Sequence, residues 1–288
     1  MCGMSRIGQV NMSKAGPDKE ITHHEGELVT SVEQAKRQWK LDAISTGTGV
    51  FLALFMWGHM FFVSSILTGE RGFNWISDLF EHYWLAQPTL VVVTIVFFVH
   101  FVTASRKIPA KLAERKRVKK LGDDISSSEW NISKGDRKEL EKVRPHKETS
   151  LWIWQVRSGM IILALGSVHL FVVIADVVQR TFNIGGGLGI NAAETMERVQ
   201  GGMWILYAIL LYAVEVHAGI GLYRVTVKWG LGAKIPVIGT RITRSMAQKM
   251  ERIVLWFFLI IGFLTLLVMA GVIDPPLEFL LPPESGQK

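Results

Sequence analysis

The segment LLYAVEVHAGIGLYR, Leu210–Arg224, is almost entirely apolar but carries a carboxylate, Glu215, and an imidazole, His217. Such a run belongs in a protein core or in a lipid bilayer, and in both places ionisable side chains are costly. It is part of one of five apolar blocks, each long enough to cross a bilayer of about 30 Å at a rise of ~1.5 Å per residue. The sequence therefore predicts an all-α membrane protein with five transmembrane helices. The blocks are residues 44–67, 87–105, 151–178, 201–223 and 253–272.

The basic residues of the chain, whose formal net charge is +7, alternate with these predicted crossings. Lys and Arg are concentrated in residues 1–40, 106–147 and 224–252 and are sparse in the intervening loops. This is the positive-inside pattern, so we expect the N-terminus in the cytoplasm, the C-terminus outside and no nucleic-acid partner. With the single cysteine, Cys2, no disulfide, Cys-ligated zinc site or Cys-ligated iron–sulfur cluster can be built within one chain.

The chain divides by composition into three parts. We expect a polar cytoplasmic N-terminal extension at 1–40, which does not read as a signal peptide, and an outer C-terminal tail at 274–288. Between them lies a five-helix transmembrane domain, 41–273, with a charged cytoplasmic segment at 106–150. Within that segment, residues 110–120 are predicted to lie along the membrane surface or to form a solvated basic helix. The glycine-rich stretch 182–191 is predicted to be an outer loop and not a phosphate site.

Four of the eight histidines lie inside apolar blocks, one in each of the first four: His59, His100, His169 and His217. Counting from the block ends places His59 and His169 in the outer half of the membrane, and His100 and His217 in the inner half. One intramembrane histidine is commonly a hydrogen bond between helices. Four of them at two matched depths favour two iron sites, each with a haem clamped from both faces. A metal or proton transporter that uses His and Glu is the alternative.

Two haems stacked in a four-helix core would form an electron path across the bilayer. Small residues near the histidines, namely Gly58, Gly166, Gly219 and Gly221, would leave room for a flat macrocycle, although they also serve plain helix packing. The sequence contains no second redox motif. We therefore expect a lipid-soluble quinone, a partner protein, or both, to supply and accept the electrons.

Four stretches of the chain resemble a known family. They are GVFLALFMWGHMFFVSSILTGE around His59, VHFVTASRKIP around His100, TSLWIWQVRSGMIILALGSVHL around His169 and LLYAVEVHAGIGLYRVTVKWG around His217. They resemble the haem b subunit of succinate:quinone oxidoreductases, in particular the di-haem, five-helix cytochrome b subunit of bacterial menaquinol:fumarate reductases. The resemblance covers about residues 41–230, whereas the N-terminal extension and residues 110–147 match poorly.

The resemblance implies that His59 and His169 ligate a distal haem near the outer face, and that His100 and His217 ligate a proximal haem near the cytoplasm. It implies an iron–sulfur subunit and a flavoprotein subunit docked on the cytoplasmic side, and a dimer of such heterotrimers in the bacterial inner membrane. Electrons would pass from menaquinol through the two haems to the clusters, the flavin and fumarate. A succinate dehydrogenase anchor running in reverse, and the cytochrome b anchor of a hydrogenase or formate dehydrogenase, remain alternatives.

Two acids are implied in proton chemistry. Glu81, in LFEHYWLAQP, matches a quinol-site glutamate, and its neighbour His82 is a weaker candidate; by position alone, Glu81 reads as a solvated loop carboxylate. Glu215 cannot hold the His217 ring, because helical residues two apart point about 200° from each other. The resemblance implies that Glu215 relays protons across the membrane, and a protonated structural carboxyl is the alternative.

Haem propionates need cationic or hydrogen-bonding partners. Lys228 matches a lysine that pairs with a proximal propionate. Trp152, Ser45 and Thr46 resemble positions near the same haem, although the family carries a glutamine where Ser45 stands. Arg198 is the candidate for the distal propionates, with an alignment that is off by one residue. For these four, anchoring at the membrane interface is an equally good explanation.

Overall fold

The computed structural model of the chain describes residues 17–127, 147–182, 190–230 and 244–281. These residues form helices and connecting turns, with no strand among them. Five of the helical stretches are long and apolar enough to cross a membrane. The predicted all-α class and the five transmembrane helices are therefore confirmed. The stretches are Ser31–Thr68, Ala86–Val118, Ser150–Thr181, Ala192–Trp229 and Ser245–Met269.

By internal contacts the chain divides into two units, Met1–Ile44 and Ser45–Lys288. Helix α1 (Pro17–Ser64) begins in the first unit, where residues 31–40 are exposed. From Ser45 onward α1 belongs to the second unit, which contains all four intramembrane histidines. The helix bundle described below is this second unit.

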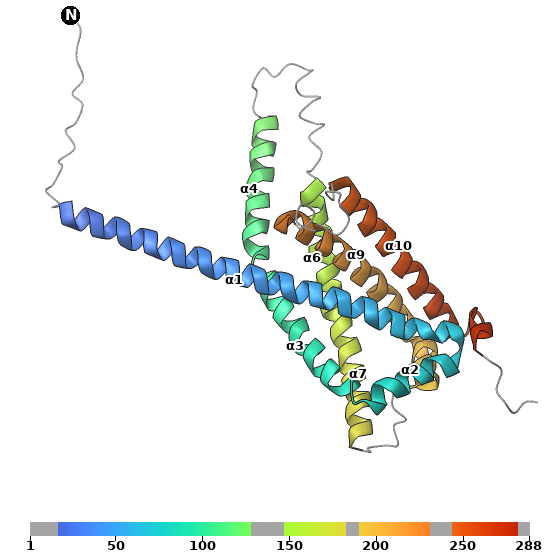
Figure 1. The fold of residues 1–288 in the computed structure, drawn as a ribbon. Coiled ribbons are helices and arrows are strands. Elements are labelled where there is room, and N and C mark those ends of the chain that lie inside the picture. The colour runs from blue at the N-terminus through green and yellow to red at the C-terminus, as the bar shows by residue number, and fades with distance from the viewer. Residues whose placement is uncertain (1–16, 128–146, 183–189, 231–243, 282–288) are drawn as a thin grey trace, which may run out of the picture. The chain divides into compact units, whose positions relative to one another are not determined.

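A sharp reversal follows the first membrane helix. A short 3-10 turn, η1 (Ser65–Thr68), ends at Gly69, whose φ of 93° is a conformation that glycine adopts without steric cost. Helix α2 (Glu70–His82) then runs to a turn in which Trp84 has a φ of 53°. The chain returns through α3 (Ala86–Ser105) and continues almost directly into α4 (Ile108–Ser127), as Figure 1 shows.

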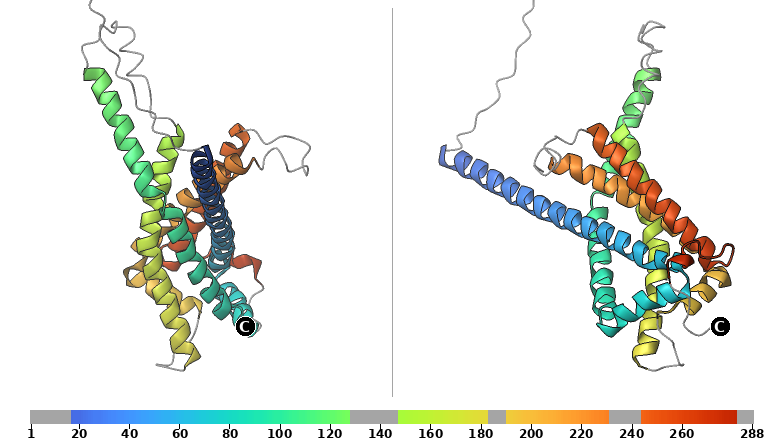
Figure 2. Two further views of the ribbon diagram at one scale, coloured as in Figure 1. Left: turned by 90° about the vertical axis from the view of Figure 1, so that its left-hand side faces the viewer. Right: turned by 45° about the vertical axis from the view of Figure 1, so that its right-hand side comes forward.

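The third membrane helix consists of α6 (Lys147–Ile161) and α7 (Ser167–Thr181), joined by a π-turn, η2 (Ile162–Gly166). The fourth begins with α8 (Ala192–Arg198), passes a second π-turn, η3 (Val199–Met203), and continues as α9 (Trp204–Trp229). Within η3, Gly202 has a φ of 109°, and the helix is kinked there. The fifth is α10 (Arg244–Met269), which packs beside α9, as the right-hand view of Figure 2 shows.

A compact core forms where η1, α2, α8 and α10 meet, at what we call the α2 end of the bundle. Hydrogen bonds tie α2 to the start of α8: Asn74 Oδ1 accepts from the Ala192 N–H at 2.8 Å, and the Ser77 hydroxyl donates to the Ile190 carbonyl. Burial of this apolar cluster fixes the α2 end. Its buried residues are Ile66, Leu67, Phe73, Ala192, Val199, Val268 and Met269.

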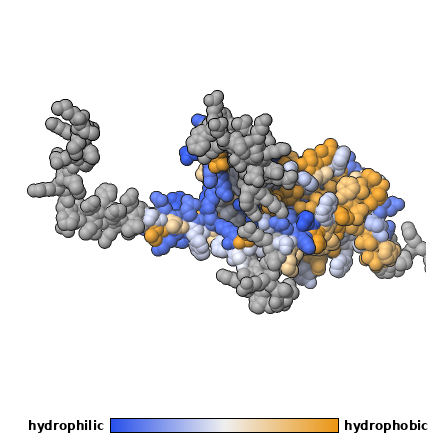
Figure 3. Space-filling view, turned by 90° about the horizontal axis from the view of Figure 1, so that it is seen from above, coloured by the Kyte–Doolittle hydropathy of each residue, from blue (hydrophilic) through white to orange (hydrophobic). Residues whose placement is uncertain are grey.

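Elsewhere, large apolar side chains point outward. Phe171 is 72% exposed and Ile253 is 68% exposed, which a bilayer accommodates and water does not. Apolar side chains dominate the face where α10 runs (Figure 3). The opposite end of the bundle, where Ser45, Arg106 and Trp229 lie, is called the α4 end below.

Candidate functional site

The four intramembrane histidines come together as two pairs. His59 of α1 and His169 of α7 have ring centres 6.1 Å apart, and His100 of α3 and His217 of α9 have ring centres 6.3 Å apart. These are the pairs that the sequence predicts from depth. Each pair takes its two rings from helices that are distant in the sequence.

Both separations fit a single metal ion between two imidazoles. A metal–nitrogen bond of about 2.0 Å on each side, plus roughly 1 Å from each nitrogen to its ring centre, gives about 6 Å. A haem iron takes two axial ligands from the protein in this way. The rings need not be parallel, because rotation about the metal–nitrogen axis leaves the separation unchanged; the interplanar angles are 53° and 89°. The histidine pairs therefore fit haem iron.

Hydrogen bonds fix which nitrogen of the His100 and His217 rings can bind a metal. His100 Nδ1 lies 3.1 Å from the Ser45 carbonyl oxygen, and His217 Nδ1 lies 2.9 Å from the Gln155 carbonyl oxygen. A carbonyl can only accept, so Nδ1 carries the proton in each ring and Nε2 keeps its lone pair for a metal. One hydroxyl also reaches each Nδ1: Thr48 at 3.2 Å and Ser158 at 3.3 Å.

The His59–His169 pair has a different, mainly aromatic setting. Phe55 stacks on His59 at 5.8 Å, and Tyr207 meets His169 edge-on at 5.5 Å. Among the described residues, the buried Nδ1 of His169 has no hydrogen-bond partner. The two pairs therefore differ in how firmly hydrogen bonds hold their rings.

Two further glycines, which the sequence analysis does not single out, lie against histidine rings. A Cβ added at Gly49 would lie 2.8 Å from His100 Cε1, and one added at Gly159 would lie 2.9 Å from His217 Cε1. Real Cβ atoms do not approach so closely, so a larger residue at either position would have to displace the histidine ring.

At the four glycines named from the sequence, an added Cβ would not meet a histidine ring. Gly58 has nothing within 4 Å of an added Cβ, and Gly166 faces the Phe97 ring. Gly219 faces the side chain of Glu251, and Gly221 faces Gln155.

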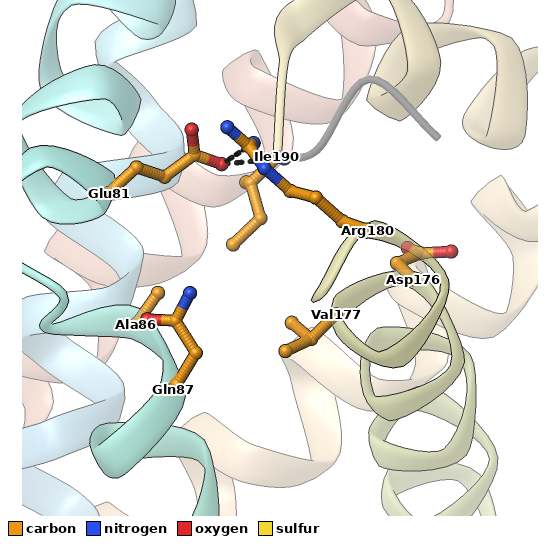
Figure 4. Close-up of a pocket in the computed structure, with 7 residues that line it drawn as sticks. All are labelled: Glu81, Ala86, Gln87, Asp176, Val177, Arg180 and Ile190. Atoms are coloured by element: carbon orange, nitrogen blue, oxygen red, sulfur yellow. Dashed lines mark hydrogen bonds and ion pairs between the residues drawn. The ribbon is translucent and has the colours of Figure 1, made fainter. Parts of the chain in front are cut away.

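Glu81 lies in a small pocket at the α2 end, shown in Figure 4. Its Oε1 forms an ion pair with Arg180 and accepts from the Ile190 N–H at 3.2 Å. The Glu81 side chain is only 16% exposed, so it is not the solvated loop carboxylate that position alone suggests. His82 is exposed and packs against Tyr83. The pocket is lined by Glu81, Ala86, Gln87, Asp176, Val177, Arg180 and Ile190.

Gln87 adds an unused acceptor to this pocket. Its side-chain Oε1 is buried and has no hydrogen-bond partner among the described residues. Buried acceptors are normally satisfied, so this one is open to a donor from a bound water or from a ligand hydroxyl. Gln87, Asp176 and Arg180 were not identified from the sequence, because they reach the pocket from the start of α3 and the end of α7.

Glu215 is 2% exposed and does face away from the histidine pair. Its carboxyl lies beside Trp57 of α1, whereas His217 meets His100 and the carbonyl of Gln155. The Trp57 indole stacks on Phe258 of α10 at 5.4 Å, and its Nε1 finds no partner of full hydrogen-bond geometry among the described residues. Glu215 therefore lies deep between α9, α1 and α10.

Basic side chains gather at the α4 end, near His100 and His217. Lys107, Lys111, Arg224 and Lys228 lie close enough to interact electrostatically. Lys228 is exposed, with Nζ 5.5 Å from the centre of the Trp229 ring. This group of four is called the α4-end cations below. The sequence alone identified only Lys228 of these four.

Trp152 and Thr46, predicted near the proximal propionates, lie at the α4 end, and Arg198, predicted near the distal ones, lies at the α2 end. Trp152 is half-buried with Lys111 Nζ 5.7 Å from its ring centre, and Thr46 is half-buried beside Ser45. Arg198 pairs with Asp176 at 2.6 Å, at the end of the bundle where Tyr207 packs on His169.

The π-turn η3 lies between Arg198 and α9. A π-turn accommodates an extra residue in a helix.

Comparison with known proteins finds similar chains of one family. Residues 136–261 match the family described as succinate dehydrogenase/fumarate reductase transmembrane subunit. The fumarate reductase cytochrome b subunit of Wolinella succinogenes is 33% identical over 235 residues, which cover 78% of this chain and 79% of that protein. The fumarate reductase cytochrome b subunit of Helicobacter pylori is 31% identical over 234 residues, 78% of each chain.

Proposed function

This chain belongs to the family of succinate dehydrogenase and fumarate reductase transmembrane subunits, and on that basis we propose that it is the quinol-oxidising membrane anchor of a fumarate reductase. The observation that carries the proposal is the presence of two histidine pairs on facing membrane helices, with ring centres 6.1 and 6.3 Å apart. Two b haems, when bound there, supply one-electron carriers between menaquinol and the soluble subunits.

The protein's contribution to electron transfer is to hold and orient these groups. His59 and His169 hold the distal haem, and His100 and His217 hold the proximal haem. The Ser45 and Gln155 carbonyls keep the two proximal rings in the tautomer that presents Nε2. The α4-end cations supply positive charge for proximal propionates, and Trp152, Ser45 and Thr46 supply hydrogen-bond donors. Arg198 supplies positive charge for the distal propionates.

Menaquinol oxidation belongs in the Glu81 pocket. Oxidation of a quinol to a quinone releases two electrons, which the haems would accept when bound, and two protons. The Glu81 carboxylate takes the proton of one hydroxyl, and the proton of the other passes to water on the outer side. Arg180 and the Ile190 N–H hold this carboxylate in place, and Gln87 Oε1 is free to accept from a quinol hydroxyl. Glu215 is the relay for protons that cross the membrane with the electrons.

The partners and the orientation follow from the same proposal. An iron–sulfur subunit and a flavoprotein subunit dock at the α4 end, which faces the cytoplasm of a bacterium, and the C-terminus lies outside. The three subunits form a heterotrimer that dimerises in the inner membrane.

A reduced-minus-oxidised optical spectrum of the purified complex, with haem quantified per chain, tests the proposal. We expect b-type haem at two per chain. Absence of haem would leave a transporter as the better explanation, and a nickel or molybdenum subunit in the complex would indicate a hydrogenase or formate dehydrogenase anchor. Turnover in both directions with a low-potential naphthoquinol would separate fumarate reduction from succinate oxidation.

A further inference from the structure

The first and third membrane helices carry the same set of residues at the same spacing. A hydroxyl residue and a glycine stand side by side, and a histidine follows the glycine by ten positions. Each member of one set lies 110 positions from its counterpart in the other. The sets are Thr48, Gly49 and His59 in α1, and Ser158, Gly159 and His169 in α6 and α7.

The contacts made by the two sets also correspond. In α1, the Thr48 hydroxyl lies 3.2 Å from His100 Nδ1, and Gly49 leaves the space that the His100 ring occupies. In α6, the Ser158 hydroxyl lies 3.3 Å from His217 Nδ1, and Gly159 leaves the space for the His217 ring.

The correspondence extends to the backbone. The carbonyls that accept from the two Nδ1 atoms belong to Ser45 and Gln155, which are again 110 positions apart. Sequence spacing and three independent contacts therefore agree in both copies.

We infer that Thr48–Gly49 and Ser158–Gly159 are two copies of one ring seat, and that they are positioning residues for the proximal haem. Each seat fixes the ring that the following membrane helix contributes, and the histidine ten positions later serves the other haem. The inference rests on the proposed function, because it requires that His100 and His217 ligate one iron.

General helix packing does not account for this pattern. Small residues are common where membrane helices meet, but Gly47 and Gly58, on the same helix as Gly49, have nothing within 4 Å of an added Cβ. The two copies differ in one respect: the third helix passes through the π-turn η2 between Gly159 and His169, and α1 stays regular. The two copies therefore share the contacts with the histidine ring but differ in the conformation of the helix that follows.

The experiment compares alanine substitutions at the seats with matched controls in the intact complex. In Gly49→Ala and Gly159→Ala the added methyl displaces the ring, so we expect haem to fall from two to about one per chain. The low-spin electron paramagnetic resonance signal of one haem should be lost and that of the other kept. In the controls Gly47→Ala and Gly58→Ala both haems and both signals should remain.

Hydroxyl variants test the seats without adding bulk. Thr48→Val and Ser158→Ala should keep both haems and shift the midpoint potential of one and the same haem. Thr48→Ser and Ser158→Thr, which keep a hydroxyl, should have the wild-type potential. Two haems with unchanged spectra and potentials in the glycine and hydroxyl variants alike would overturn the inference. A wild-type complex with fewer than two haems would instead overturn the proposed function on which it rests.

Discussion

The carboxylate of Glu81, at the end of α2, is ion-paired with the guanidinium of Arg180, near the end of α7. The pair closes one side of a pocket that also contains Gln87 Oε1, which has no partner within the part of the chain that the structure describes. In the proposed function, this ion pair keeps the base at a fixed position against a bound quinol, and such positioning contributes to catalysis.

Glu81→Gln should abolish menaquinol oxidation, because the amide keeps the size of the side chain and cannot take a proton. Fumarate reduction driven by an artificial dye should be unchanged, since it bypasses the pocket. Both rates are measured on the same purified complex. Asp78→Asn, an exposed position one turn earlier on α2, is the control and should retain quinol activity. A normal quinol rate in Glu81→Gln would remove this residue from the mechanism.

Arg180→Gln should lower kcat/KM for menaquinol by about tenfold, because the charged hydrogen bond to Glu81 is lost. The loss is moderate because Arg180 is partly exposed and solvent screens its charge. Steady-state kinetics at several quinol concentrations will show whether kcat or KM carries the loss. The neighbouring exposed Gln179→Ala should behave as wild type. Unchanged kinetics in Arg180→Gln would mean that the ion pair serves structure alone.

His100→Ala and His217→Ala should each remove the same haem, and His59→Ala should remove the other. The reason is that a bis-histidine iron loses its clamp when either ring is absent. Haem content per chain, together with redox titration of the remaining haem, identifies which one is left. Retention of both haems in any of these variants contradicts the pairing.

Glu215→Gln should slow quinol-driven fumarate reduction in the membrane and leave the dye-driven rate intact, because the amide fills the same buried space without carrying a proton. The measurement is turnover of the complex in sealed proteoliposomes. If the variant turns over quinol at the wild-type rate, Glu215 is a structural carboxyl and the electron path stands without it.

Much of the fold was predictable because membrane helices are uniform. Length and hydropathy predict five crossings, and counting residues along straight helices places His59 with His169 and His100 with His217. The same periodicity predicts that Glu215 faces away from His217, as it does. These inferences need only the rise and the turn of a helix.

The ring seats and the partners of Glu81 were beyond such counting. Whether Gly49 or Gly58 contacts a histidine ring depends on which helix lies opposite. Arg180, which pairs with Glu81, lies 99 positions after it in the sequence. The distortions at η2 and at Gly202 also alter the register of their helices. Residues 128–146 and 183–189, including most of the predicted glycine-rich loop, lie outside the described part of the chain, and their assignments remain predictions.

The histidine pairing has a consequence for biogenesis. In the proposed function, each haem takes one ligand from the first two membrane helices and one from the third and fourth. A nascent chain that has inserted only α1 and α3 thus presents a single ligand for each iron, and the clamp on the proximal one closes only when His217 is synthesised. We expect a chain ended after α7 to retain no proximal haem, so that cofactor loading reports completion of α9 and would let a cell distinguish finished anchors from stalled ones.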